Sequence, residues 1–539
     1  MLKIKELEQA RREARKLAEA AGLDPYPVIF GIVDYDQLNE LAAYDGFPER
    51  YPHWQFGMSY DYWRKRSAYS GWWTYELVLN TNPAIAYLRK SNTLIENKAV
   101  MIHVYAHADF FKNNQWFKHT PKDMIKVMHT HAERIEEYMN KYGVVEVESF
   151  IDKALSIQYD LDQYAPFIKR RRPSKKEEDH EEIVKIPIKR DYMERFINPP
   201  EWLERQRQRL KELKEKRKQM RDETELEKPQ KDLVGFLMRY GHLEDWQKDI
   251  LAMIREESHY FVPQMMTKIM NEGWAAYFES KIMAEFAAPN EFLDHADMHS
   301  RVLGGGVLNP YKLGKLIWED IKERWDKGRF GREWELCKDK EKREKWDTKA
   351  GLGTEKIFEV RRNYNDITFL DEFFTEEIFE KLNLFAYEYV PETGAYHITS
   401  RDFQDVKKKI LFLHTNLGRP TIKVATGNYD NKGELLLHHE WNGIGLHIDD
   451  AKAVLKNIYH TWGRPVNLKT IIMRKVRDPD PMRNRIHPDR PLTAVLEPQG
   501  VMLRYDGENF RELALSPDEV KDIRLDEVNY NTTPREWIG

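Results

Sequence analysis

The sequence predicts a mainly α-helical N-terminal region and a smaller α+β part toward the C-terminus. Apolar residues recur at helical spacing over about the first 385 residues, whereas from residue 386 onward they alternate as they do in strands. A chain of 539 residues, of which 41% are hydrophobic, is too long for one hydrophobic core. We therefore expect several domains, most of them helical.

Shifts in composition divide the chain into five expected parts. Two apolar helical regions flank a stretch that is rich in charge and poor in aliphatic residues, which is typical of a solvated linker or an exposed helix. In chain order, the parts are the first helical half of the core with the His103/His107 helix (1–168), the charged linker or exposed helix (169–231), the second helical half with the Glu272/Glu279 helix (232–385), a small α+β module (386–475) and an extended C-terminal arm with one hairpin (476–539).

Individual elements follow from periodicity and from helix-ending residues. The N-terminal helix should end at Gly22, because glycine readily adopts the left-handed conformation that closes a helix. Pro263 should interrupt the amphipathic helix that begins near residue 245, because proline lacks an amide proton. The other expected elements are a strand at Val28–Val33, helices at 35–44, 121–141, 147–158, 264–285 and 290–300, hairpins turned at Asn431–Gly433 and Asp506–Gly507, a helix at 451–463 and a strand at 464–473.

Composition excludes several classes of function. The formal net charge is −4 with both signs abundant, so no overall field attracts nucleic acid or an anionic membrane, and we do not expect nucleic-acid binding. The single cysteine, Cys337, rules out an internal disulfide and a cysteine metal cluster. We find no signal peptide and no apolar run that could span a membrane, and the glycines at 304–306 fit no nucleotide-binding motif. These features predict a soluble cytoplasmic protein without a nucleotide cofactor.

The stretch around His103 and His107 carries the strongest functional signal. The two histidines lie four residues apart in an apolar segment, so on a helix both imidazoles occupy one face. A second expected helix carries Glu272 and Glu279, seven residues apart and again on one face. If the two helices meet, two imidazoles and two carboxylates could close around a divalent metal ion, and zinc is the favoured candidate.

Candidate roles follow from this arrangement. Val104 stands where a HExxH zinc helix has its general base, so a base must come from elsewhere. Glu256, Glu257 and Glu272 are candidates, and we favour Glu256. Glu279 would be a further ligand or would support catalysis. The candidate metal ligands are His103, His107 and Glu272, the candidate substrate contacts are Asp109, Asn113 and Trp274, and aromatic residues from 46–57 and 110–117 would wall the pocket.

Structural interpretations stay open for the same residues. A histidine pair at this spacing is often part of a core, and the glutamate helix could be amphipathic with two solvated acids. Glu256 and His259 form one Glu-x-x-His unit, but di-iron helical proteins need two such units and further carboxylates. His129 and His131 face different sides of a helix, which is typical of surface histidines.

Five motifs together resemble the SpoVR family, the stage V sporulation protein R family. In chain order they read AYDGFPERYPHWQFGM, NTNPAIAYL, HVYAHADFFKNNQWF, NEGWAAYFE and LNPYKLG, and the resemblance extends from about Gly22 to about Trp462. It implies a cytoplasmic protein that is linked to formation of the spore cortex, a peptidoglycan layer. It also implies a PrkA-type serine kinase and a von Willebrand A-type protein as partners, because their genes often lie beside those of the family.

Two positions depart from the family pattern. Family members typically have Trp-His where this chain has Phe278-Glu279, and often Ala-Tyr where it has Ser258-His259. Glutamate and histidine are both ordinary ligands of zinc and iron, so Glu279 could replace a histidine ligand.

Two hypotheses of function result. The first is a metal-dependent hydrolase-like protein that acts on an amide in a peptide or a peptidoglycan precursor, through a water activated by the metal. The alternative is a non-catalytic regulatory or scaffold protein that acts with the kinase and the von Willebrand A-type partner. The first hypothesis requires the His103 helix to pack against the Glu272 helix.

Overall fold

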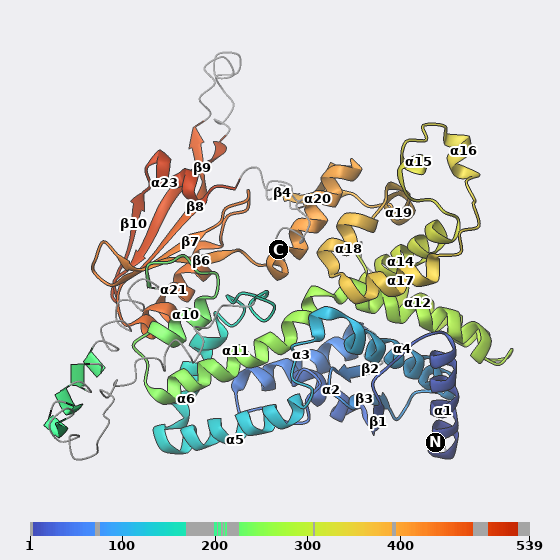
Figure 1. The fold of residues 1–539 in the computed structure, drawn as a ribbon, viewed down its shortest axis with the longest axis horizontal. Helices are drawn as coiled ribbons and strands as arrows, with labels where there is room; N and C mark the ends of the chain where they lie inside the picture. The colour runs from blue at the N-terminus through green and yellow to red at the C-terminus, as the bar shows by residue number, and fades with distance from the viewer. Residues whose placement is uncertain are drawn as a thin grey trace, which may run out of the picture.

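The structure, a computed structural model, describes residues 4–70, 76–168, 226–304, 308–390, 395–477 and 494–525, with short stretches between 199 and 212. Helices predominate in the N-terminal and middle regions, and a five-stranded sheet dominates the C-terminal region (Figure 1), which confirms the predicted fold class. Most of the charged stretch 169–231 lies outside the described residues. Among the described helices, none combines the length and the apolar character that crossing a lipid bilayer requires.

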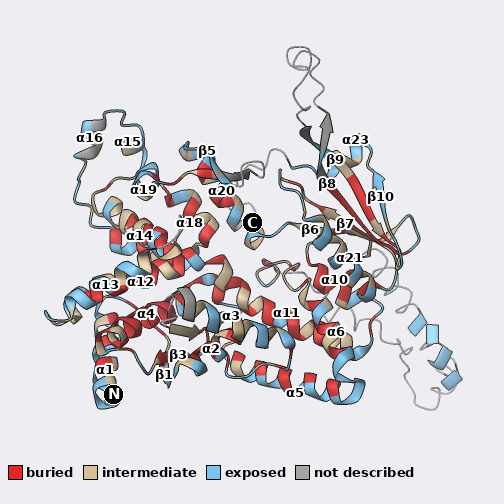
Figure 2. Cartoon of the chain, turned by 180° about the vertical axis from the view of Figure 1, so that it is seen from behind, coloured by how far each residue is buried: buried red, intermediate tan, exposed pale blue. Residues whose placement is uncertain are grey.

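The centre of the first half is helix α4 (Leu94–Asn113), which is buried along most of its length. It begins with a capping box, in which the Thr93 hydroxyl accepts from the Glu96 amide and the Glu96 carboxylate accepts from the Thr93 amide. Every residue from Ala99 to Phe111 is buried, as the red of this helix in Figure 2 shows. Polar side chains on such a helix must find partners inside the protein. The other elements of this half are α1 (Ile4–Ala20), β1 (Val28–Val33), α2 (Tyr35–Ala43), α3 (Trp54–Ser70), β2 (Glu76–Leu79), β3 (Ala84–Arg89), α5 (Met124–Tyr142) and α6 (Val144–Leu155).

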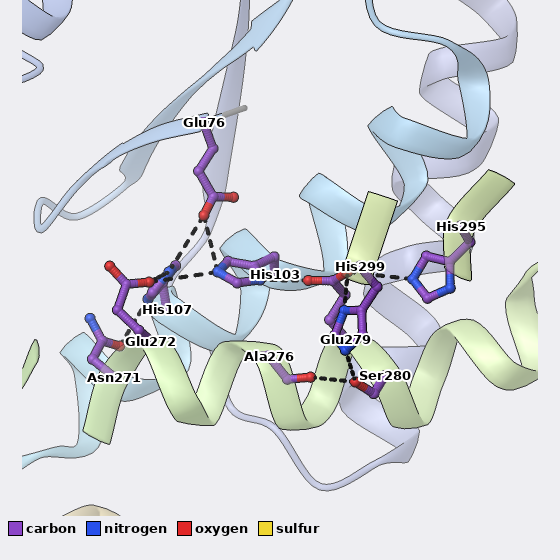
Figure 3. A network of polar contacts seen from close by, with 10 residues as sticks. All are labelled: Glu76, His103, His107, Asn271, Glu272, Ala276, Glu279, Ser280, His295 and His299. Carbon is purple, nitrogen blue, oxygen red and sulfur yellow. Dashed lines mark hydrogen bonds and ion pairs between the residues drawn. The ribbon is translucent and has the colours of Figure 1, made fainter. Parts of the chain in front are cut away.

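A three-stranded sheet packs on α4 and brings Glu76 to it. The strand order is β1-β3-β2, with β3 parallel to β1 (Val28 opposite Ala84) and antiparallel to β2 (Leu79 opposite Ile85). Both β2 and β3 contact α4. Glu76 is the first residue of β2, and its side chain points toward the α4 histidines (Figure 3).

Helix α11 continues through Pro263, so the expected interruption was wrong. Only one turn follows the buried proline before the helix ends at Met266, so little of the helix depends on the missing amide bond. The elements of the second half are α10 (Leu233–Tyr240), α11 (Asp245–Met266), α12 (Lys268–Phe286), α13 (Phe292–Leu303), α14 (Pro310–Asp326), α15 (Arg332–Glu335), α16 (Lys340–Glu344), α17 (Gly353–Asn363), α18 (Asp366–Phe373), α19 (Glu376–Leu382), β4 (Ala386–Val390), β5 (Ala395–Ser400) and α20 (Phe403–His414).

Helix α12 packs against both α4 and α14, and its direction is fixed at two places. At its N-terminus the amides of Ile269 and Met270 donate to the buried carboxylate of Asp366 at 2.8 and 2.9 Å. At the crossing with α14, Gly273 and Gly314 lie against each other, because a Cβ on Gly273 would come within 2.4 Å of the Gly314 Cα. The side chains of α12 that face α4 are therefore held in a defined position.

The C-terminal sheet has the order β10-β9-β8-β7-β6. Strands β7 and β8 are parallel and are joined through α21, while β9 pairs with β8 from Val466 opposite Tyr505 to Arg477 opposite Ala494. Both expected hairpins are present, and the strands of the expected arm belong to the same sheet as the expected module. The elements are β6 (Ile422–Tyr429), β7 (Glu434–His439), α21 (Ile448–Trp462), β8 (Val466–Arg477), β9 (Ala494–Tyr505), β10 (Phe510–Ala514) and α23 (Pro517–Ile523).

This sheet packs against helices from both halves of the chain. One hydrophobic cluster joins Val147 of α6, Phe236 of α10 and Trp246 of α11 to Val424 and Leu503 of the sheet. A separate cluster contains the buried apolar residues of α1, α4, α12 and α14. The histidine pair therefore belongs to a core that is distinct from the one beneath the C-terminal sheet.

Replacing Gly273 with alanine should push α12 away from α14. The new Cβ would meet the Gly314 backbone at 2.4 Å, and a backbone cannot move aside as a flexible side chain can. We expect the free energy of unfolding to fall by about 1–3 kcal/mol, as for other overpacked cores. Urea denaturation measures this change.

The matched control is Gly57→Ala in α3, because nothing lies within 4 Å of the added methyl group. Alanine at this exposed helical position should raise the free energy of unfolding by about 0.5–1 kcal/mol. A Gly273→Ala protein as stable as the wild type would contradict the close crossing.

Candidate metal site

Two imidazoles and two carboxylates converge between α4, α12 and β2 (Figure 3). The Nε2 atom of His103 lies 3.0 Å from Glu76 Oε1 and 3.8 Å from Glu272 Oε2. The Nε2 atom of His107 lies 3.7 Å and 3.4 Å from the same two oxygens. We call these four residues the central cluster. It exists because the helix of the two histidines packs against the helix of Glu272, as the metal hypothesis requires.

Acceptors on the outer side of each imidazole fix the position of its proton. His103 Nδ1 lies 2.7 Å from Glu279 Oε2, and His107 Nδ1 lies 2.9 Å from Asn271 Oδ1. Carboxylate and amide oxygens only accept, so both Nδ1 atoms donate. In a neutral ring, Nε2 then carries a lone pair. Both lone pairs face the carboxylates of the central cluster, and this is unfavourable unless a cation lies between them.

Three buried atoms of the central cluster have no hydrogen-bond partner within the described part of the chain. They are His103 Nε2, Glu76 Oε2 and Glu272 Oε2. Nearly all buried polar atoms in proteins form hydrogen bonds, so three exceptions at one place need an explanation. A divalent cation bound among these residues would provide one.

The pKa values of the cluster show how strongly it attracts positive charge. Burial alone would lower the pKa of His107, but the nearby carboxylates of Glu272 and Glu76 raise it to about 9. Burial opposes a charge on His103 as well, yet its three carboxylate neighbours hold its pKa well above the ordinary value. Burial would raise the pKa of Glu272, and its contacts with both histidines instead bring it far below the usual range. Protons or a metal ion can supply the positive charge.

A cavity of 430 Å³ opens beside the central cluster and reaches Glu76, His107 and Glu272. Of the expected aromatic walls, Phe111 lines this cavity, but no residue of 46–57 lines it. That expectation was wrong because Tyr51 and Phe56 pack into the cluster beneath the C-terminal sheet. The remaining lining residues are Asp45, Leu77, Val78, Tyr159, Phe261, Gln264, Met265, Lys268, Asn271 and Tyr311.

The structure brings together four of the residues singled out in the sequence, namely His103, His107, Glu272 and Glu279. Glu279 lies behind His103, on its Nδ1 side, and so supports that imidazole from outside the central cluster. Glu256 is not brought to the cluster. Its carboxylate is half exposed and lies 3.5 Å from Nε2 of His131, because its side of α11 faces α5.

The three candidate substrate contacts form a polar network in which Asp109 and Trp274 are buried and Asn113 is half-buried, and none of them lines the cavity. The Asp109 carboxylate pairs with Arg361 at 2.5 Å and accepts from Trp274 Nε1 at 2.9 Å. The Asn113 amide donates to the Asp109 backbone oxygen at 2.8 Å. These side chains connect α4, α12 and α17, so their contacts here are structural.

Sequence reasoning missed Glu76, Asn271 and Tyr311. Glu76 begins a four-residue strand, and such a short strand gives no periodic signal that relates it to a distant helix. Asn271 directly precedes Glu272 in the chain, and only the glutamate was predicted to belong to the site. Tyr311 lies in the motif LNPYKLG, where Asn309 accepts from its amide at 2.9 Å, so membership of that motif was the available signal.

The stability of the metal-free protein should fall as pH rises from about 6.5 to about 9. The pKa of His107 is about 9 in the folded protein, whereas that of a free histidine side chain is about 6.5, so protonation favours the folded state. This contribution is complete below pH 6.5, is lost as pH rises through 9, and amounts to at most about 3 kcal/mol. Urea denaturation in the presence of a chelator at several pH values measures it.

Two comparisons make this measurement specific. Zinc should remove the dependence, because the ion replaces the protons, and His107→Gln should remove the share due to His107. A metal-free wild-type protein whose stability is the same at pH 6.5 and pH 9 would contradict the charge arrangement.

Comparisons with known proteins agree with the motifs in the sequence. Residues 2–419 match the family described as SpoVR like protein, and residues 420–472 match the SpoVR-like C-terminal domain. A relative from Escherichia coli (strain K12), named uncharacterized protein YcgB, is 26% identical over 488 residues, which cover 85% of this chain and 90% of the relative. No solved structure matches the chain. The protein belongs to the SpoVR family.

Proposed function

We propose that this protein is a metal-dependent hydrolase that cleaves an amide bond. The observation that carries the proposal is the pair of imidazole lone pairs and the two carboxylates that converge at the wall of the cavity. A set of two histidines and one carboxylate, with one position left for water, is a common donor set of catalytic zinc sites. Zinc is therefore the proposed ion.

The four residues of the central cluster divide into ligands and a base in this proposal. His103, His107 and Glu272 hold the ion, because all three project from the tightly packed helices α4 and α12. Bound zinc lowers the pKa of a water molecule and polarises a carbonyl group. Glu76 comes from the strand on the opposite side, lines the cavity, and would accept the proton of the attacking water.

Tyr311 would stabilise the negative charge that develops on the carbonyl oxygen. Its side chain lines the cavity, and burial together with the nearby carboxylates of Glu272 and Glu76 raises its pKa well above the ordinary value. The hydroxyl therefore stays protonated and can donate a hydrogen bond at neutral pH.

The walls of the cavity favour a peptide-like substrate with an anionic group. Leu77, Val78 and Met265 offer apolar contacts, Gln264 offers an amide, and Lys268 offers a positive charge. A short peptide with a free carboxylate combines these properties. Peptide stems of peptidoglycan precursors are such molecules, and they agree with the spore-cortex link that the family resemblance implies.

The family resemblance supplies the proposed cellular setting. We place the protein in the cytoplasm, where precursors are made, with a PrkA-type serine kinase and a von Willebrand A-type protein as regulatory partners. A purely regulatory role is the alternative, but it would not explain why the central cluster and its cavity exist.

Protein purified without a histidine tag and loaded with zinc should release amine from some members of a panel of short peptides, including precursor stems. Glu76→Gln should lower kcat by about 100-fold or more while the zinc content stays unchanged, because only the base is lost. Glu272→Gln should lose the zinc ion of the central cluster together with activity, because a ligand is lost. Amine release and zinc content are measured on the same samples.

Glu256→Gln is the matched control, since this half-exposed carboxylate lies beside His131 and does not line the cavity. It should keep both zinc and activity. Zinc-loaded wild type that cleaves no peptide of the panel, or a fully active Glu76→Gln variant, would contradict the proposal.

A further inference from the structure

A second group of metal-ligating side chains lies behind His103. Glu279 Oε1 is 3.4 Å from His295 Nε2 and 3.4 Å from His299 Nδ1 (Figure 3). One ligand atom from each of these residues lies within 4.8 Å of the others. We call Glu279, His295 and His299 the second cluster. It shares no residue with the central cluster.

The second cluster is built by two helices. Glu279 projects from α12, whereas His295 and His299 lie four residues apart on α13, with their rings stacked at 5.7 Å. Glu279 and His295 are buried, and the side chain of His299 is 14% exposed. The spacing of the two histidines is the same as that of His103 and His107, so the sequence carried this signal as well.

The hydrogen bonds of Ser280 favour one proton position on His299. When the Ser280 hydroxyl donates to the Ala276 carbonyl at 2.8 Å, it accepts from His299 Nε2 at 2.9 Å. In this arrangement His299 Nε2 carries the proton. Its buried Nδ1 has no hydrogen-bond partner among the described residues, and in a neutral ring its lone pair faces the Glu279 carboxylate. A cation between these two atoms would resolve the repulsion.

We propose that Glu279, His295 and His299 bind a second divalent cation of the zinc type. Two imidazole nitrogens and one carboxylate oxygen form the donor set, and it leaves a position open for water. The two oxygens of Glu279 contact different histidines. Oε2 accepts from His103 at 2.7 Å, and Oε1 faces the two histidines of α13. The Glu279 carboxylate thus links the second cation to a ligand of the first.

Zinc counting by mass spectrometry tests this inference. Protein stripped with a chelator, reloaded with zinc and freed of excess metal should contain two zinc ions per chain. His295→Ala and His299→Ala should each contain one, and so should His107→Gln, which damages the central cluster instead. The matched control is His129→Ala, whose half-exposed side chain contacts Glu49 and Glu133 on the surface. It should contain two.

The outcomes separate this inference from the proposed function. One zinc ion in the wild type that is lost in His107→Gln and kept in both α13 variants would overturn the second site and leave the central one in place. The Glu279 contacts would then be ion pairs with protonated histidines. One zinc ion that is lost in the α13 variants and kept in His107→Gln would support the second site and contradict the proposed function. Circular dichroism verifies the fold of each variant, and two independent α13 substitutions guard against a misfolded one.

Discussion

The arrangement of the whole helical region depends on two imidazoles on a helix that is buried along most of its length. Because α4 has almost no exposed side, His103 and His107 cannot turn to water, and each must be satisfied by groups from other elements. Outer acceptors from α12 bind the Nδ1 atoms, and carboxylates from α12 and β2 surround the Nε2 atoms. This arrangement is stable only with positive charge at its centre, as protons or as a metal ion.

Helix α12 contributes most of these partners, so its placement decides the geometry of both clusters. Asn271, Glu272 and Glu279 all come from this one helix. The carboxylate of Asp366 fixes its N-terminus, and burial raises the pKa of that carboxyl to about 7 even though it accepts backbone amides. The crossing of Gly273 with Gly314 lies one residue beyond Glu272, so the closest helix contact supports the metal-binding side chains directly.

Local spacing predicted the parts of the site that lie on helices. The four-residue spacing of His103 and His107 and the seven-residue spacing of the two glutamates placed each pair on one face, and the structure joins those faces. Periodicity says nothing about a strand of four residues, and Glu76 was therefore missed. It also does not tell which side of a long helix meets a cavity, so Glu256 was chosen although its side of α11 faces α5. Asp109 and Trp274 lie in two different sequence motifs, and the structure brings them together in a hydrogen bond.

X-ray absorption at the zinc edge gives the sharpest test of a metal site in the central cluster, because it reports the ligands of the bound ion. With zinc limited to one equivalent in His299→Ala, where the second cluster is damaged, we expect nitrogen and oxygen ligands at about 2.0–2.2 Å, with multiple scattering from two imidazoles and no sulfur. The same sample carrying His107→Gln should lose one imidazole signal or the metal altogether. A shell of water oxygens alone, or a spectrum unchanged by His107→Gln, would contradict a metal site in the central cluster.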